Sequence, residues 1–163
     1  HIMMLELYKN AIKAENEVIK AFINENRPLL WCYGEYTENN QKYDCITEGH
    51  VLIAFGFNTF AISKEKFEIN NRVLNNISQL IDKESLSYEP AQLIGTRIVE
   101  DGKKYTRCVL KKESTGEEIF FNEKYKKYFT DNVEYRVRDS KTPIKIYNGN
   151  VFMGIIMPVC MRE

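Results

Sequence analysis

Hydrophobic and polar residues alternate along this chain with two different periods. Over residues 5 to 23 the apolar positions recur every three or four residues, which predicts an amphipathic helix that ends before Pro28. The apolar side of that helix is expected to hold Tyr8, Ala11, Ile12, Ile19, Phe22 and Ile23, and the opposite side Lys9, Lys13, Asn16 and Lys20. Glu15 also falls within the apolar arc, and the helical period does not explain why a charged residue stands there.

Beyond residue 28 the pattern changes to short apolar or alternating runs that are rich in aromatic residues, which is typical of strands. Strands are predicted over 29–37, 43–47, 51–55, 58–62, 92–99, 104–112, 117–121, 132–140, 143–147 and 151–161. The run from Val51 to Phe55 is apolar throughout, so we expect it to be buried on both faces. Asp101-Gly102 and Asn148-Gly149 predict tight hairpin turns.

Two shorter helices complete the prediction, one over residues 72–82 and one over 123–129. Strands outnumber helices, and short turns join most neighbouring strands. We therefore expect an α+β domain in which helices pack on one side of an antiparallel sheet. The length of 163 residues suits one domain with a substantial core.

Composition narrows the classes of partner. The formal net charge is zero, so no global basic field attracts nucleic acid or an anionic membrane. Contact with DNA would need a local patch, and two groups of lysines are candidates: Lys9, Lys13 and Lys20, and Lys124, Lys126 and Lys127. The more common origin of such patterns is the solvated face of a surface helix.

The cysteine and histidine content argues against a metal site. Four cysteines (Cys32, Cys45, Cys108, Cys160) lie far apart without a CxxC pair, and His50 is the single histidine outside the first three residues, which look like a cloning remnant. We expect no metal or cofactor, and four buried thiols in a reducing cytoplasm. No signal peptide or apolar run of membrane-spanning length is predicted, so no membrane partner is expected.

No recognised catalytic motif occurs in the chain. Cys45 and His50 are close enough in sequence to suggest a nucleophile with its base, but alternation along a strand does not bring their side chains together. A core cysteine and a turn histidine are the simpler interpretation, and we expect the protein not to be an enzyme.

Several short motifs resemble a domain of the bacterial DNA polymerase sliding clamp, the β subunit of the replicase. Phe121-Asn122-Glu123-Lys124-Tyr125 is similar to the family's FNxKY, residues 27–30 to its RPxL, and Ile156-Met157-Pro158-Val159 to its final strand. Thr47-Glu48-Gly49-His50-Val51-Leu52 is similar to its TDGHRLA. These motifs occur in the family's order within one domain.

The resemblance implies a single clamp-like domain over residues 4–163, with an inserted helix and hairpin at about 68–115. It implies that the lysines of the first and third helices face duplex DNA. It also implies a pocket for short peptides of replication proteins, formed by Thr47, Gly49, His50, Leu52, Met157, Pro158 and Val159. In the family that pocket combines two domains, so the sequence leaves open whether its two halves meet within one chain.

The function that follows is a non-catalytic, sliding-clamp-like protein, of phage or mobile-element origin, that acts in DNA replication or its regulation. It would contact DNA or a partner peptide, and a ring would require a homo-oligomer. The alternative is a protein-binding module or inhibitor that mimics a clamp domain and does not contact DNA.

Overall fold

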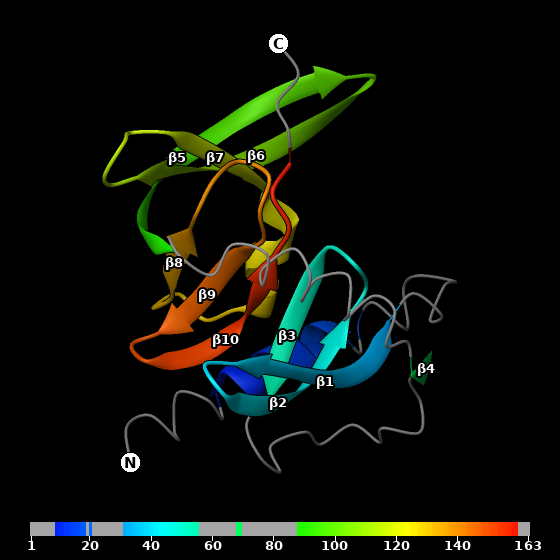
Figure 1. Ribbon diagram of the computed structural model, residues 1–163. Coiled ribbons are helices and arrows are strands. Elements are labelled where there is room, and N and C mark those ends of the chain that lie inside the picture. The colour runs from blue at the N-terminus through cyan, green and yellow to red at the C-terminus, as the bar shows by residue number, and fades with distance from the viewer. Residues whose placement is uncertain (1–8, 19, 21–30, 56–67, 70–87, 160–163) are drawn as a thin grey trace.

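The fold is dominated by one large, mostly antiparallel sheet (Figure 1). The computed structural model describes residues 9–18, 20, 31–55, 68–69 and 88–159. A helix covers residues 9–18. The strands are β1 (Cys32–Glu38), β2 (Gln41–Thr47), β3 (Val51–Phe55), β4 (Glu68–Ile69), β5 (Glu89–Asp101), β6 (Lys103–Lys112), β7 (Glu118–Asn122), β8 (Glu134–Val137), β9 (Ile144–Asn148) and β10 (Val151–Ile156).

The strand order in the sheet is β4-β1-β2-β3-β10-β9-β8-β5-β6-β7. Every neighbouring pair is antiparallel except β1 with β4. The predicted antiparallel sheet is therefore confirmed. The expected balance of helix and strand is not, because in the described residues only the helix over 9–18 and the 3-10 helix η3 (Glu123–Tyr128) accompany ten strands.

Local turn chemistry explains most of the hairpins. Asn39 and Asn40 both have positive φ, at 51° and 63°, and connect β1 to β2 as the residues of a tight two-residue loop. Gly102 lies at the tip of the β5–β6 hairpin with φ of 69°, and Gly149 begins the β9–β10 turn with φ of 59°. The turns predicted at the two glycines are confirmed.

The sheet is packed on both faces. One cluster lies under the helix and joins Ala11, Ala14 and Val18 to strand residues such as Ile53 and Phe121. A second cluster on the other face contains Tyr36, Tyr43, Cys45, Leu52, Ala54, Tyr147, Phe152 and Ile155. All five residues of β3 are buried, as predicted from its apolar run, because its alternate side chains enter the two clusters.

A buried ion pair borders the second cluster. The ammonium of Lys145 lies 2.7 Å from a carboxylate oxygen of Glu38, and the two side chains are 12% and 5% exposed. Burial raises the pKa of Tyr36 and of Tyr147, and the nearby Glu38 carboxylate raises both further.

The helix presents a different face to the core from the one predicted. Ile12 is 55% exposed, whereas Asn10 and Glu15 are buried beside Ala11 and Ala14. The prediction that Ile12 belongs to the apolar face is therefore wrong. The lysine-bearing side was placed correctly, since Lys9, Asn16 and Lys20 are exposed and Lys13 is half-buried. Tyr8, Ile19, Phe22 and Ile23 lie outside the described residues.

The hairpin expected to be part of an insertion is continuous with the sheet. β5 begins by pairing with β8, and β6 pairs with β7 along Arg107–Lys111. The predicted strand at 58–62 and helix at 72–82 lie outside the described residues. The predicted helix at 123–129 is confirmed as η3, which Asn122 caps by accepting a hydrogen bond from the N–H of Lys124.

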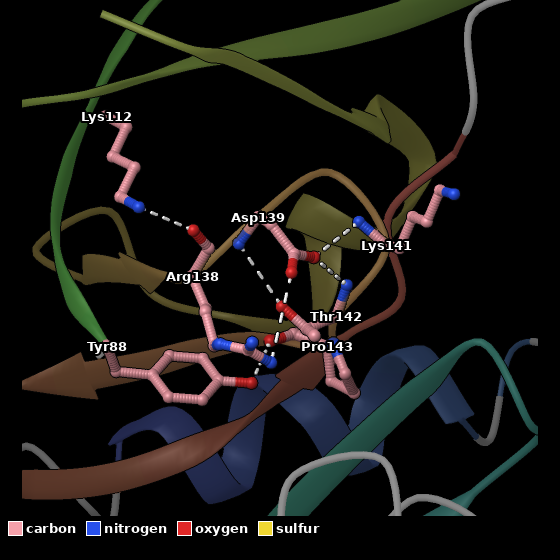
Figure 2. Close-up of polar contacts among 7 residues, drawn as sticks. All are labelled: Tyr88, Lys112, Arg138, Asp139, Lys141, Thr142 and Pro143. Carbon is pink, nitrogen blue, oxygen red and sulfur yellow. Dashed lines mark hydrogen bonds and ion pairs between the residues drawn. The ribbon is translucent and has the colours of Figure 1, made fainter. Parts of the chain in front are cut away.

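The turn from β8 to β9 ties this hairpin to the rest of the sheet (Figure 2). Asp139 accepts hydrogen bonds from the N–H groups of Lys141 and Thr142, both at 2.9 Å. Burial opposes its charge, but these N–H groups hold the pKa of Asp139 below its usual value. Lys112 at the end of β6 donates to the Arg138 carbonyl at 2.7 Å, and Tyr88, directly before β5, donates to that of Pro143 at 2.8 Å.

Candidate functional site

The Gly49-His50 turn is built by the side chains of the two residues that precede it. The hydroxyl of Thr47 accepts from the N–H of Gly49 at 3.0 Å and donates to the carbonyl of Val51 at 2.8 Å. A carboxylate oxygen of Glu48 accepts from the N–H groups of His50 and Val51. Gly49 has φ of 103°, a conformation that residues with a Cβ rarely adopt. The turn is thus fixed by its own sequence.

The segment after β10 runs directly beside this turn. The N–H of Met157 donates to the carbonyl of His50 at 2.8 Å, and the N–H of Val159 donates to that of Phe120 at 2.8 Å. The two halves of the predicted peptide site therefore meet within one chain. We call Gly49, His50, Met157, Pro158 and Val159 the turn–tail surface.

Accessibility differs sharply among the residues of the predicted peptide site. The side chain of His50 is 68% exposed, lies 3.5 Å from the Glu48 carboxylate and stacks on Tyr125 at a ring distance of 6.3 Å. Met157, Pro158 and Val159 are half-buried. Thr47 and Leu52 are fully buried, so they support the turn and the second cluster and cannot touch a ligand directly.

The lysines predicted to face DNA lie on the helix and on η3. Lys9, Lys20, Lys124, Lys126 and Lys127 are exposed, and Lys13 is half-buried. Lys20 pairs with Glu17 at 3.3 Å. The ammonium groups of Lys124 and Lys127 lie over the rings of Tyr125 and Tyr128, at 5.0 Å and 5.2 Å.

One cavity of about 820 Å³ brings part of the two lysine groups together. Its lining includes Lys13 from the helix with Lys126 and Lys127 from η3, although these segments are far apart in sequence. Lys9, Lys20 and Lys124 do not line it. Four carboxylates do, namely Glu113, Glu123, Asp131 and Glu134.

The rest of the cavity lining was not predicted from the sequence. Ala91, Leu93, Phe129, Val133 and Tyr135 supply its apolar side. The sequence held one indication of this apolar surface: Leu93 and Ile94 are apolar at successive positions. Successive side chains of a strand point to opposite faces, so a single core-facing side cannot bury both. Leu93 and Ile94 are in fact 38% and 49% exposed.

Cys45 and His50 do not form a nucleophile and base. The Cys45 thiol contacts the Tyr43 carbonyl at 3.5 Å inside the second cluster, and burial raises its pKa well above the usual value. His50 instead stacks on Tyr125. Cys32, Cys45 and Cys108 are buried thiols, as predicted, and Cys160 lies outside the described residues. In the part of the chain that the structure describes, no cluster of side chains is suited to hold a metal ion.

Comparison of the chain with models of known protein families, with curated proteins and with solved structures found no match. Within the described ranges, no helix has both the length and the apolar character needed to cross a membrane.

Proposed function

We propose that this protein is a non-catalytic, clamp-like protein that acts in DNA replication or its regulation by binding a short peptide of a partner at the turn–tail surface. One observation carries the proposal. The hydrogen bond from Met157 to His50 joins the two motifs that resemble the peptide pocket of the sliding clamp, without any second domain.

The chemistry of this surface suits a peptide. The half-buried side chains of Met157 and Pro158 offer apolar contact, and the exposed imidazole of His50 offers a hydrogen-bonding group. Methionine adapts its shape to different apolar partners. Thr47 and Glu48 keep the turn rigid, so little conformational entropy is lost when a peptide binds.

Isothermal titration with a polymerase peptide that binds bacterial sliding clamps tests this proposal. We expect binding by the full chain, and a loss of about tenfold or more in affinity for a variant with His50→Ala and Met157→Ala. Ile12→Ala, which removes an exposed apolar side chain elsewhere, is the matched control. Absence of binding, or equal affinity in both variants, would contradict the proposal.

A second candidate function is contact with duplex DNA through the lysines of the helix and η3. The observation behind it is the convergence of Lys13, Lys126 and Lys127 on one cavity, although four carboxylates line the same cavity. Binding of a labelled duplex would be followed by fluorescence anisotropy at rising salt. If two phosphates are contacted, Lys126→Glu with Lys127→Glu should weaken binding and reduce the salt slope by about two.

Lys103→Glu with Lys104→Glu, at the tip of the β5–β6 hairpin, makes the same change of charge away from the cavity. If this control weakens DNA binding as much as the η3 variant, the effect is one of net charge and the lysines of η3 are not the contact. If no DNA is bound even at low salt, the alternative of a protein-binding module without DNA contact is favoured.

A further inference from the structure

Among the described strands, one edge of β5 is paired only at its start. β8 pairs with β5 only through Glu89–Ala91, whereas β6 pairs with it as far as Asp101. In the described part of the chain, no strand pairs with the β8-side edge of β5 from Gln92 onward. Figure 1 shows β5 at the top of the molecule extending well beyond β8. Such an edge presents a row of backbone donors and acceptors that another extended chain can pair with.

This edge carries few of the side chains by which proteins usually protect an exposed strand, although the register of β5 with β6 shifts between Leu93 and Gly95. From Gln92 to Val99 it carries no lysine or proline. Its one cation, Arg97, is directed to β7, where it pairs with Glu118 at 2.8 Å and lies over the ring of Phe120. Ile94 and Ile98 are 49% and 69% exposed.

The 820 Å³ cavity opens where β5 and β8 separate. Gln92 and Leu93 line it from β5, Glu134 lines it as the first residue of β8, and Val133 lines it directly before that strand. An extended chain that pairs with β5 beyond Ala91 would continue the ladder that β8 leaves. Its alternate side chains would point to the apolar lining at Leu93, Val133 and Phe129, or away from it.

Charge around the cavity favours a peptide over a nucleic acid. Among the described residues, Lys13, Lys126 and Lys127 form no ion pair, although the ammonium of Lys127 lies over the ring of Tyr128. Four carboxylates also line the cavity and would repel the continuous negative charge of a phosphate backbone. A peptide can place a single carboxylate at the lysines and apolar groups elsewhere.

We propose that the β5 edge and the adjoining cavity bind an extended segment of a partner protein as an added β-strand. An apolar side chain of that segment fills the space lined by Leu93 and Val133, and an acidic side chain faces Lys126 and Lys127. This site is separate from the turn–tail surface, so either proposal can fail without the other.

The test uses the full chain and a phage-displayed library of linear twelve-residue peptides. Enriched peptides would be synthesised, and their affinity measured by fluorescence anisotropy. We expect enriched sequences that combine apolar residues at alternate positions with an acidic residue. We also expect the backbone amides of β5 that point away from β6, between Gln92 and Asp101, to become protected from hydrogen exchange when the peptide binds.

Variants then locate the site. Leu93→Asp should lower peptide affinity by about tenfold or more, because it puts a charge on the apolar lining. Lys126→Glu with Lys127→Glu, both exposed positions, should also lower it and serves if Leu93→Asp impairs folding. Tyr105→Asp is the matched control, since Tyr105 is 37% exposed on the same hairpin and does not line the cavity. It should leave affinity unchanged.

Several results would overturn the proposal. The proposal fails if the library yields no enriched peptide, or if the peptides bind the Leu93→Asp and η3 variants as well as they bind the native chain. Loss of binding in His50→Ala with Met157→Ala alone would move the peptides to the turn–tail surface. If duplex DNA binds, the η3 variant abolishes that binding and no peptide binds, the cavity is assigned to nucleic acid. If the chain forms a dimer that Leu93→Asp abolishes, the edge is assigned to a second copy of the chain.

Discussion

Gly154 has no room for a side chain. A Cβ built there would overlap the carbonyl oxygen of Leu52 and lie 2.9 Å from the ring of Phe129. Its φ is 155°, and the register of β10 shifts between Phe152 and this glycine. The missing side chain therefore lets β10 bend against β3 while Phe129 packs over it.

We predict that Gly154→Ala lowers the free energy of unfolding by about 2–4 kcal/mol, because backbone and a buried ring must both move to admit one methyl group. Urea denaturation of the purified variant measures this loss. Gly102→Ala is the control, since Gly102 has φ of 69° but no atom within 4 Å of the built Cβ. Its cost should be about 1–2 kcal/mol, and equal losses at the two positions would argue against the close approach.

The sequence predicted the turn glycines but not the role of Gly154. Gly102 and Gly149 each stand in a local motif that specifies a turn. Gly154 stands within an apolar run, and only the packing of Phe129 across β10 explains why a glycine is needed there. That contact joins distant parts of the chain, so no local pattern records it.

The helix over residues 9–18 shows the same limit at the scale of an element. Its existence and its lysine-bearing side followed from the period of 3.6, and Glu15 is buried in agreement with its place in the apolar arc. The buried face, however, includes Asn10 and excludes Ile12. Asn10 is 1% exposed, and its side-chain oxygen accepts from the N–H of Thr130 at 3.0 Å. Because asparagine is polar, the sequence pattern predicts it to be exposed. Only the structure shows the hydrogen bond with Thr130 that allows its burial.

We predict that Asn10→Ala lowers the free energy of unfolding by about 1–3 kcal/mol, because it leaves the half-buried N–H of Thr130 without its acceptor. Ile12→Ala should change stability by less than about 0.5 kcal/mol. Thermal unfolding followed by circular dichroism would compare them. If Ile12→Ala is the more damaging change, the helix faces the sheet with its other side.

At the scale of the whole molecule, the strands were predicted more reliably than their arrangement. Runs such as β3 and β8 followed from their apolar patterns, and the hairpins followed from their turns. The junctions β3–β10 and β5–β8 join strands distant in sequence, and nothing local specifies them. The turn–tail surface depends on the first junction and the cavity on the second, so neither site could be assembled from the sequence.

Burial of tyrosines predicts that the whole fold is sensitive to high pH. Burial raises the pKa of Tyr88 and of Tyr135 to about 12, and it also raises those of Tyr36 and Tyr147. An unfolded tyrosine ionises near pH 10. The stabilisation is therefore complete below about pH 10 and is lost as the pH rises from about 10 towards 12, because only the unfolded chain then releases its protons.

Each such tyrosine should contribute a fall of up to about 1.4 kcal/mol per pH unit in that window. Urea denaturation at pH 8 to 11 measures the slope, and absorbance at 295 nm reports ionisation. Tyr135→Phe should make the slope of unfolding free energy against pH shallower by the contribution of one tyrosine. A slope unchanged by that substitution would mean that Tyr135 ionises freely in the folded protein.

The pairing of β3 with β10 also has a consequence for folding kinetics. Ile53 lies opposite Gly154, so the centre of the sheet closes through a very long loop. Topologies rich in such distant contacts fold slowly, on a scale of about milliseconds to seconds. During synthesis, the inner edge of β3 must wait for β10 to leave the ribosome, and until then the face of the β1–β2–β3 meander that carries Tyr36 and Leu52 lacks its contacts with Phe152 and Ile155.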